Sequence, residues 1–321
     1  MIAGQDKAVG QFASAWRSRR LHHAWLLAGP KGVGKASFGK EAATRVLAEA
    51  AGPAVHLPGL DTPADHPIAK LLAAGSHPDF RWLERLERPT GGLARNISVD
   101  QIRSLQALLS VTPSMSPWRA IVIDSVDDLE ASAANALLKM LEEPPANTIF
   151  FLVSHAPGRL LPTIRSRCRR LDFSRLDDDV MTSLLSRSLP EEKSGAIAQL
   201  VEFAEGSIGR AIDIAALDLA PLESDAQAIL REGDPDNVRR SRLASALGTK
   251  SAADRYSAFL QLVPGLLARE AVGLEGEARG RALEAYEKAQ QTVAIAPRLS
   301  LDPGATVFEL GGILASVALK R

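Results

Sequence analysis

Short apolar runs alternate with helical patterns over the first half of the chain. Four runs have the length of buried strands: 24–28, 80–86, 120–124 and 149–154. Around them lie helical patterns that cover 1–20, 38–51, 99–109 (with Ser98 as a cap), and a segment that begins at Asp128 or Ser132 and stops at Pro144. This alternation predicts an α/β domain with a parallel sheet.

The strand pattern ends at Asp172, and only helical patterns follow. Three short helices are expected at 176–189, 191–205 and 208–217, which predict a small helical lid. From Ala220 to Arg321 the pattern stays helical, with breaks at 233–235, 248, 273–276 and 302–304. The sequence therefore predicts three parts: an α/β domain over 1–173, a lid over 174–217 and an all-α domain over 218–321.

The residues after the first apolar run have the spacing of a phosphate-binding loop. Gly29, Gly34 and Lys35 form the pattern G-x-x-x-x-G-K, with Gly32 inside it. Glycines let backbone N–H groups turn toward phosphate oxygens, and a lysine at this place reaches the β- and γ-phosphates. The helix that follows presents its positive end to the same anion. We therefore predict a phosphate loop.

The residue after Lys35 departs from this pattern. A Ser or Thr is needed there because its hydroxyl binds Mg²⁺, and this chain has Ala36. Ser37 does not replace it, since one residue along a helix turns the side chain by roughly 100°. The loop is therefore expected to have compromised metal chemistry.

The third apolar run ends in Asp124, and Ser125 follows it. In nucleotide-hydrolysing domains such a strand delivers an acid to the Mg²⁺ shell, and a neighbouring glutamate activates the attacking water. Asp124 fits the first role, whereas Ser125 cannot act as the base. We do not expect Asp127 to reach the site, because it lies two residues further on and outside the strand.

Further polar residues follow at places where such domains contact ligands. Ser154 ends a buried strand, where open α/β sheets place ligand-sensing side chains. Residues 165–170 have the sequence Arg-Ser-Arg-Cys-Arg-Arg, and a solvated basic edge accounts for Arg165, Arg169 and Arg170. Arg210 lies at the junction of two predicted lid helices.

Composition excludes several kinds of site. The 321 residues are 46% hydrophobic and 24% charged, as is ordinary for a globular protein. Lys plus Arg and Asp plus Glu number 38 each, so no global charge indicates nucleic acid. Cys168 is the only cysteine, which excludes an internal disulfide and a cysteine-based zinc site. His56, His66 and His77 lack metal-ligand spacing, so no zinc is expected.

Neither a membrane span nor an export signal is expected from the sequence. No apolar run approaches the roughly 18 residues of a membrane span, and the N-terminus lacks the layout of a signal peptide. We therefore expect a cytoplasmic protein without a membrane partner.

Three blocks together resemble the clamp-loader branch of the AAA+ ATPases. They are the phosphate loop, the segment 131–145 with Asn-Ala-Leu-Leu-Lys-x-Leu-Glu-Glu-Pro-Pro, and the segment 160–168, which ends in Ser-Arg-Cys. The phosphate loop alone is a weak signal, but the other two blocks at this spacing are specific. Within that branch the chain is most similar to the δ′ family of bacterial DNA polymerase III, over motifs from about residue 2 to 212.

This resemblance implies roles for individual residues. In that family the arginine of Ser-Arg-Cys, here Arg167, projects into the ATP site of a neighbouring subunit. Ser154 matches the sensor 1 position, and Arg210 matches the sensor 2 arginine of the lid. Gly4 and Gln5 match a segment near the adenine. The implied fold is an α/β AAA+ domain, a small helical lid and an all-α C-terminal collar.

Departures from the family pattern favour a subunit that does not hydrolyse ATP. Ala36 replaces the Mg²⁺ hydroxyl and Ser125 replaces the catalytic glutamate. The leading hypothesis is a structural and regulatory subunit that completes a ring and supplies Arg167 to its neighbour. No ATPase activity is expected of the chain alone, although the resemblance implies that it is a component of a DNA-directed DNA polymerase holoenzyme. No cofactor is then required, and no zinc is expected. Weak binding of ATP or ADP by Lys35, Arg210 and the loop amides stays open.

The resemblance also implies partners and a location. The partners are τ/γ and δ subunits in a hetero-oligomeric ring and, through the assembly, the sliding clamp and primer-template DNA. The location is the nucleoid-associated replisome in the cytoplasm.

Two alternatives remain. One is an ATP-hydrolysing τ/γ-type motor subunit or a related AAA+ ATPase, against which the two missing groups argue. The other is a small-molecule phosphate-loop kinase, which would leave the C-terminal helices unexplained. ATP turnover by the purified chain, alone and with partners, separates the motor subunit from the leading hypothesis.

Overall fold

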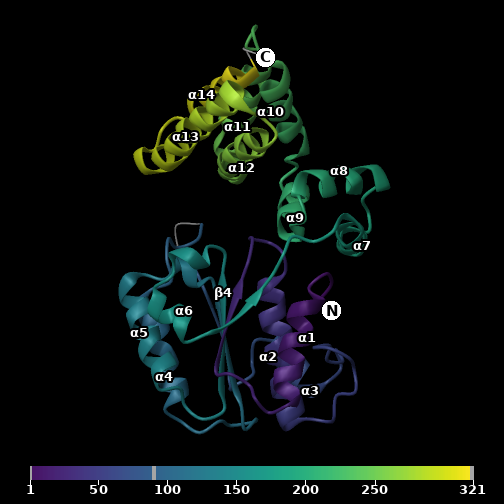
Figure 1. Ribbon diagram of the computed structural model, residues 1–321, viewed down its shortest axis with the longest axis vertical. Helices are drawn as coiled ribbons and strands as arrows, with labels where there is room; N and C mark the ends of the chain where they lie inside the picture. Colours follow the sequence, from purple (N-terminus) through teal and green to yellow (C-terminus); the bar gives the residue numbers. More distant parts are fainter. Residues whose placement is uncertain (1, 89–91, 319–321) are drawn as a thin grey trace. The chain divides into compact units, whose positions relative to one another are not determined.

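A computed structural model of the chain describes residues 2–88 and 92–318 (Figure 1). It forms two compact units. The first comprises Met1–Glu191 and Glu205–Gly209, and the second comprises Glu192–Ala204 and Arg210–Arg321. Each unit has its own elements and its own core.

The first unit is built on a five-stranded parallel sheet in the order β2-β3-β4-β1-β5. Its strands are β1 (Ala24–Ala28), β2 (Phe80–Glu84), β3 (Arg119–Asp124), β4 (Thr148–Ser154) and β5 (Arg169–Asp172). In the register of the sheet, Ala28 of β1 lies opposite Ser154 of β4 and Asp172 of β5. Because every pair is parallel, the carboxyl ends of the strands meet at one edge of the sheet.

Helices cover both faces of this sheet (Figure 1). One face carries α1 (Asp6–Arg17), α2 (Lys35–Ala51) and α3 (Pro67–Ala73). The other carries α4 (Val99–Leu109), α5 (Ala131–Glu142) and the short α6 (Pro162–Ser166). The 3₁₀ turns η1 (Val126–Asp128) and η2 (Pro157–Arg159) and the helix α7 (Asp178–Ser188) complete the unit.

The central strands are buried on both faces, as their apolar runs predict. Successive side chains of a strand point to opposite faces, so Trp25 and Leu27 enter one apolar cluster and Leu26 enters the other. Phe150 and Phe151 of β4 divide in the same way. Two cores therefore hold the sheet between its helical layers.

Local sequence accounts for two helix ends. Ser98 caps α4 as predicted, because its hydroxyl accepts the Gln101 N–H while the Gln101 side chain accepts the Ser98 N–H. Helix α5 ends at Glu142, since Pro144 and Pro145 follow and cannot continue it.

The helix expected over 1–20 is shorter than predicted. It spans Asp6–Arg17, because Gly4 has a positive φ of 70° and the Gln5 side chain binds backbone atoms of Val33 and Ser174. These contacts hold the preceding residues outside the helix.

Helix α3, strand β5 and the short helix α6 were not predicted from the sequence. Helix α3 lies inside the segment 52–79, which was expected to be loop, and its start is capped by His66, whose Nδ1 accepts the Ile68 N–H at 3.2 Å. Strand β5 carries no apolar run, because only Leu171 of its four residues is buried. Its pairing with β1, rather than its own composition, makes it a strand.

The second unit contains only helices: α8 (Ser194–Ala204), α9 (Ile208–Ala216, from Arg210 on), α10 (Ala220–Glu232), α11 (Val238–Leu247), η3 (Lys250–Ala252), α12 (Ala253–Val272), α13 (Gly276–Leu299) and α14 (Pro303–Ala318). The breaks predicted at 233–235 and 248 fall between helices, whereas those at 273–276 and 302–304 also include the first residues of α13 and α14. Gly233, for example, has a φ of 81°, which ends α10.

The two compact units differ from the predicted three-part division. Helix α7 belongs to the first unit, whereas α8 and most of α9 group with α10–α14. A side-chain contact explains part of this grouping: Arg210 of α9 pairs with Glu223 of α10. The division into a core, a lid and a collar stays a prediction.

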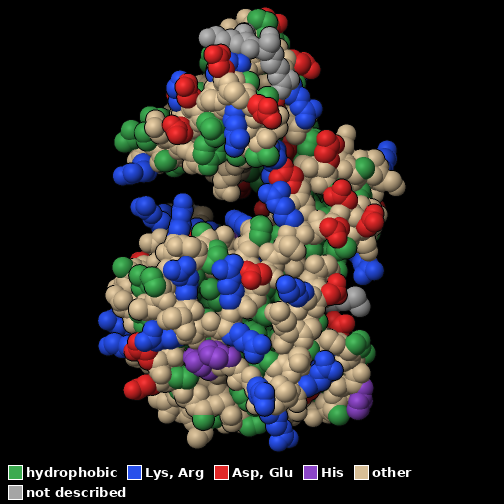
Figure 2. Space-filling model, viewed as in Figure 1, with side chains coloured by type: hydrophobic (Ala, Val, Ile, Leu, Met, Phe, Trp, Pro, Cys, Tyr) green, Lys and Arg blue, Asp and Glu red, His purple; other side chains and the backbone are tan. Residues whose placement is uncertain are grey.

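The surface is polar and mixed in charge. On the face shown in Figure 2, Lys and Arg side chains are spread over the first unit, with fewer Asp and Glu side chains among them. Of the helices in the described ranges, none combines the length and the apolar character that crossing a membrane requires.

A buried aspartate ties the segment before β3 to the start of β2. Asp79 is 2% exposed, and its carboxylate accepts N–H groups of Ser114 (2.8 Å), Met115 (2.8 Å) and Ser116 (3.1 Å). Burial by itself raises the pKa of Asp79, but these amide bonds and His77 outweigh it and hold the pKa below its usual value.

We predict that Asp79→Asn lowers the free energy of unfolding at pH 7 by about 1–3 kcal/mol, because three backbone N–H groups lose a charged acceptor. A carboxyl group whose pKa is lower in the folded state than in the unfolded state stabilises the folded protein at pH values above its unfolded-state pKa. That contribution is lost as the pH falls through the folded-state pKa. The difference between wild type and variant should therefore shrink below about pH 4. Denaturant unfolding across pH measures this, with the exposed Asp65→Asn as control. Equal stability at pH 7 would contradict the assigned role.

Candidate functional site

The phosphate loop joins the carboxyl end of β1 to the first turn of α2, as predicted. Gly29 has a φ of 155°, and a Cβ there would lie 2.2 Å from the carbonyl oxygen of Phe173, so only glycine fits. Gly34 caps α2 with a φ of 96°. Gly32 has a φ of 78°, and its carbonyl accepts the Gly209 N–H at 2.9 Å. The three glycines are therefore required by the backbone itself.

Lys35 is buried within this loop. It is 2% exposed, and its ammonium donates to the carbonyls of Gly29 (2.8 Å) and Pro30. Burial lowers the pKa of Lys35 to about 8, against the opposing charges of Asp124 and Asp127. At pH 7 the ammonium is still charged, and one of its three N–H donors remains for a phosphate oxygen. The loop and Lys35 therefore fit an anionic phosphate.

The loop lacks the side-chain hydroxyl that usually binds a magnesium ion at such a site. Ala36 packs against the apolar cluster beneath α2, and Ser37 lies on the exposed side of that helix. This agrees with the helical rotation expected between neighbouring residues. Asp124 stands at the end of β3, where burial, followed by the charge of Glu84, raises its pKa while Lys35 opposes the rise.

The position expected to hold a catalytic glutamate is structural. Ser125 is 3% exposed, and its hydroxyl donates to Asp128 at 3.2 Å. The same carboxylate oxygen of Asp128 lies 3.4 Å from the Arg85 Nε. The Ser125 hydroxyl carries no negative charge and cannot take a proton from an attacking water.

Asp127 belongs to the site, which corrects the sequence expectation. Its carboxylate accepts the hydroxyl of Ser154 (2.9 Å) and the N–H groups of His155 (2.5 Å) and Ala156 (3.3 Å). The η1 turn after β3 brings Asp127 back toward the end of β4, which no local pattern reveals. Ser154, predicted as a ligand-sensing residue, is thereby held by Asp127 and completely buried.

His155 was missed by sequence reasoning. Burial, and then the charge of Lys35, lower its pKa to about 4, so the ring is neutral at pH 7. Its Nδ1 is buried and has no hydrogen-bond partner among the described residues. The sequence could have indicated His155 by its position directly after a buried strand, because the phosphate loop lies at the same edge of the sheet.

Gln5, matched to an adenine-side segment, has a structural contact in this unit. It is 4% exposed, and its side-chain amide donates to the carbonyls of Val33 (3.2 Å) and Ser174 (2.8 Å). Gln5 therefore connects the phosphate loop with the chain after β5. Gly4 precedes it with a φ of 70°, where a Cβ would lie 2.7 Å from a side-chain atom of Leu176.

Arg167 follows α6 at the surface of the first unit. Its Nη2 lies 2.7 Å from the Glu142 carboxylate, and its Nη1 donates to the Thr163 carbonyl at 3.0 Å. The side chain is 33% exposed. Among the described residues, Arg167 makes no hydrogen bond or ion pair with its own phosphate loop; its partners are Glu142 and Thr163 in the first unit.

Arg210 belongs to the second unit, where it pairs with a buried carboxylate. Its Nη2 donates to Glu223 at 2.9 Å, and Arg269 approaches the same oxygen at 3.6 Å. Glu223 is 0% exposed. The structure thus brings Lys35 together with Asp124 in the first unit and gives Arg210 a structural contact in the second.

The histidines at 66 and 77, considered for metal, have structural contacts. His66 caps α3, and the Nδ1 of His77 accepts the Asp79 N–H at 3.1 Å. Within residues 2–88 and 92–318, no group of three or more His, Cys, Asp or Glu side chains has the arrangement of a metal site. Burial raises the pKa of the Cys168 thiol to about 12.

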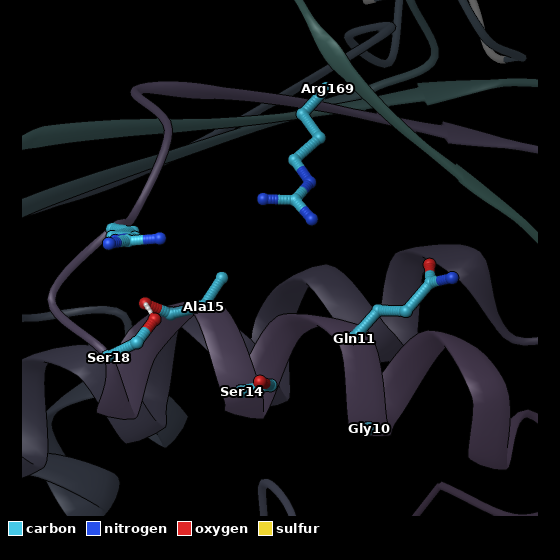
Figure 3. A pocket seen from close by; sticks show the side chains of 7 residues that line it. Gly10, Gln11, Ser14, Ala15, Ser18 and Arg169 are labelled. Carbon is cyan, nitrogen blue, oxygen red and sulfur yellow. Dashed lines mark hydrogen bonds between the residues drawn. The ribbon is translucent and has the colours of Figure 1, made fainter.

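A separate hollow of about 460 Å³ lies between α1 and β5 (Figure 3). Its lining consists of Gly10, Gln11, Ser14, Ala15, Ser18, Arg20 and Arg169. The guanidinium of Arg169 lies 5.1 Å from the centroid of the Trp25 ring. Arg169 and Trp25 are paired near the amino ends of their strands, so this hollow is at the opposite end of the sheet from the phosphate loop.

The fold and site define a class of protein. A phosphate loop after β1, an acid at the end of β3, a buried serine at the end of β4 and the strand order β2-β3-β4-β1-β5 are the features of an AAA+ domain. A family model described as DNA polymerase III, delta subunit, matches residues 4–177. The chain belongs to this family, which confirms the predicted resemblance to clamp-loader subunits.

The individual relatives are named as subunits of DNA polymerase III. The chain is 35% identical over 190 residues to DNA polymerase III subunit delta′ of Pseudomonas aeruginosa, covering 58% of this chain and 53% of that protein. It is 32% identical over 200 residues to subunit delta′ of Bacillus subtilis, covering 62% and 55%. It is 29% identical over 272 residues to subunit tau of Bacillus subtilis, covering 82% and 45%. The chain thus spans about half the length of these relatives.

We predict that Arg210→Met lowers the free energy of unfolding of the second unit by about 2–4 kcal/mol. Removing one partner of a buried ion pair typically costs about 3–5 kcal/mol, and Arg269 remains near Glu223 to limit the loss. Denaturant unfolding of the full chain measures it, with the exposed Arg279→Met as the matched control. Unchanged stability combined with lost nucleotide binding would instead favour the sensor role.

Proposed function

We propose that this chain is a subunit of the DNA polymerase III clamp loader that does not hydrolyse ATP, completes the ring and supplies Arg167 to the ATP of a neighbouring subunit. One observation carries this proposal. The phosphate loop keeps its glycines and Lys35, while Ala36 and Ser125 stand where hydrolysis needs a metal-binding hydroxyl and a carboxylate base. A protein that uses this loop to cleave ATP would need both groups.

The chain's own site is suited at most to hold phosphates. Lys35 and the loop amides offer donors, and the neutral ring of His155 adds no charge. Asp127 does not replace the missing base, because its carboxylate already accepts three hydrogen bonds. We propose weak binding of ATP or ADP without a resident metal, and no zinc in the segment 52–79.

Arg167 has the chemistry for a role outside its own subunit. A guanidinium is always charged, and its planar set of donors matches phosphate oxygens. Its position after α6 leaves a third of the side chain exposed. We therefore assign it to the γ-phosphate of a neighbouring subunit, where charge develops during phosphoryl transfer.

The proposed partners follow from the relatives. Their names include delta′, tau and gamma subunits of DNA polymerase III, so we propose that this chain assembles with τ/γ and δ. Through that ring it would act on the sliding clamp and primer-template DNA.

A second candidate is a motor subunit that hydrolyses ATP. The observation in its favour is that the match to subunit tau covers more of this chain, 82%, than the match to delta′ of Pseudomonas aeruginosa, 58%. Ala36 and Ser125 argue against it for the chemical reasons above. The arginine and lysine variants below decide between the two.

The second unit provides a surface for assembly. Large apolar side chains are exposed on its helices and the loop after α13: Val272 (82%), Leu299 (67%), Leu283 (46%), Ile295 (43%) and Leu301 (41%). Exposed apolar side chains of this kind favour burial between subunits. We propose that the second unit contributes to a collar that holds the ring together.

We predict that Arg167→Ala leaves the complex assembled but lowers its DNA- and clamp-stimulated ATPase activity. Arginine fingers are worth about 10³–10⁵ in rate at the site they serve, and a ring with several ATP sites would show a smaller total loss. Arg167→Lys should rescue poorly, since it keeps the charge but loses the planar donors. Steady-state ATPase assays and gel filtration measure the two properties.

The matched comparison is Lys35→Ala in the same chain. It should affect turnover much less than Arg167→Ala, because the site of Lys35 is not the one that turns over. A harmless Arg167→Ala with a crippling Lys35→Ala would identify this chain as the motor subunit.

We predict that the double variant Ile295→Asp, Leu299→Asp stays folded but loses assembly by at least about tenfold in affinity. The two residues are one turn apart on α13 and both exposed, so charges there oppose burial without disturbing the core. Point variants are preferable to deleting 218–321, which would remove Glu223, the partner of Arg210.

Co-purification with the partner subunits measures this assembly. Leu86→Asp in the first unit, at 59% exposure, is the control for adding charge at an exposed leucine. Full assembly of the α13 variant would refute the collar.

A further inference from the structure

Two sequence blocks far apart in the chain meet at Arg167. Glu142 is the last residue of α5, in the Leu-Glu-Glu-Pro-Pro segment, and Arg167 follows α6 in Ser-Arg-Cys. Their side chains form an ion pair at 2.7 Å through Nη2, and the Thr163 carbonyl accepts an N–H of Nη1 at 3.0 Å. The guanidinium is thus held at two points by its own subunit.

The elements that carry this pair are themselves anchored. Ile164 of α6 is 1% exposed and packs in the apolar cluster shared with Leu137 and Leu141 of α5. Pro144, two residues after Glu142, prevents α5 from continuing. The distance between Glu142 and Arg167 is therefore set by packed helices rather than by a loop.

The two contacts leave N–H donors of the Arg167 guanidinium available for a ligand. An arginine has five N–H donors; one on Nη1 goes to the Thr163 carbonyl and Nη2 pairs with Glu142, so the Nε–H and the second N–H of Nη1 are left. No other acceptor within the described ranges takes them. Arg167 can therefore keep both contacts while it binds a phosphate.

We propose that Glu142 is a positioning residue for Arg167: it fixes the guanidinium in the orientation in which the remaining donors meet a neighbour's phosphate. This inference rests on the proposed function of Arg167. A free arginine side chain loses rotamer freedom when it binds, and one already held loses less. Removing the holding contact should lower turnover at that site by roughly two- to tenfold, less than removing Arg167 itself.

A competing role for Glu142 would change ATP turnover in the opposite direction. If Glu142 competed with phosphate for Arg167, removing its charge would release the guanidinium and raise turnover. Glu142→Gln and Glu142→Ala separate the two roles, because the amide oxygen of Gln still accepts an N–H but carries no charge. Positioning predicts that Gln retains most of the activity and Ala loses it, whereas competition predicts that both variants are faster.

The experiment is steady-state ATP turnover by the assembled clamp-loader complex with primed DNA and clamp, with kcat and KM determined separately. For Glu142→Ala we expect turnover at the site served by Arg167 to fall roughly two- to tenfold, so that the kcat of the whole complex falls measurably but by less, with little change in KM. For Glu142→Gln we expect a kcat near wild type. Glu143→Ala is the matched control: its side chain is the neighbouring exposed carboxylate and makes no ion pair within residues 2–88 and 92–318. Assembly and thermal stability should stay unchanged, since exposed ion pairs contribute little to stability.

The same substitution in the Arg167→Ala background completes the test. Glu142→Ala should have no further effect there, because the residue it positions is gone. A further loss of the same size in that background would overturn the positioning role, as would an unchanged or raised kcat for Glu142→Ala, or equal losses for Ala and Gln.

These outcomes separate the inference from the function on which it rests. A harmless Arg167→Ala would overturn the proposed function and the positioning role together. A damaging Arg167→Ala with a harmless Glu142→Ala would overturn only the positioning role.

Discussion

The parallel pairing of β1 with β4 and β5 is the constraint on which the candidate site depends. It places Ala28, the last residue before the phosphate loop, beside Ser154 and Asp172. The backbone bonds continue beyond the strands, with the Gly29 N–H donating to Ser154 at 3.3 Å and the Phe173 N–H donating to Ala28 at 2.8 Å. The loop is therefore held between two strands that come from much later in the chain, and a Cβ at Gly29 would collide with this arrangement.

Burial then determines the charges at this edge. Lys35 has a lowered pKa and His155 a strongly lowered one, while the pKa of Asp124 is raised. One buried cation thus faces carboxylates of which Asp127 is already bound by three donors. Such a site can receive phosphate oxygens, but no carboxylate at position 125 is available to activate water. These properties support the proposal above that the subunit holds nucleotide without cleaving it.

The two arginines expected to act on phosphates share a feature that the motifs did not reveal. Arg167 is held by Glu142, and Arg210 is held by the fully buried Glu223. The consequences differ because the environments differ. The pair of Arg167 is partly exposed and leaves donors for a ligand, so it orients the side chain at little cost. The pair of Arg210 includes a carboxylate without access to solvent, so Arg210 is needed for the stability of its unit.

The sequence by itself determined the phosphate loop, its missing hydroxyl at Ala36, the serine at 125, the cap at Ser98 and the helix breaks after Ala220. Each of these follows from residue types at fixed local spacing, because turns, helix caps and helix ends are determined by neighbouring residues. Only the tertiary structure decided that Asp127 belongs to the site, that β5 is a strand, that His155 is neutral, and that Glu142 and Glu223 hold the two arginines. These features depend on burial and on contacts between residues from 13 to 28 positions apart or on separate elements, which no local pattern encodes.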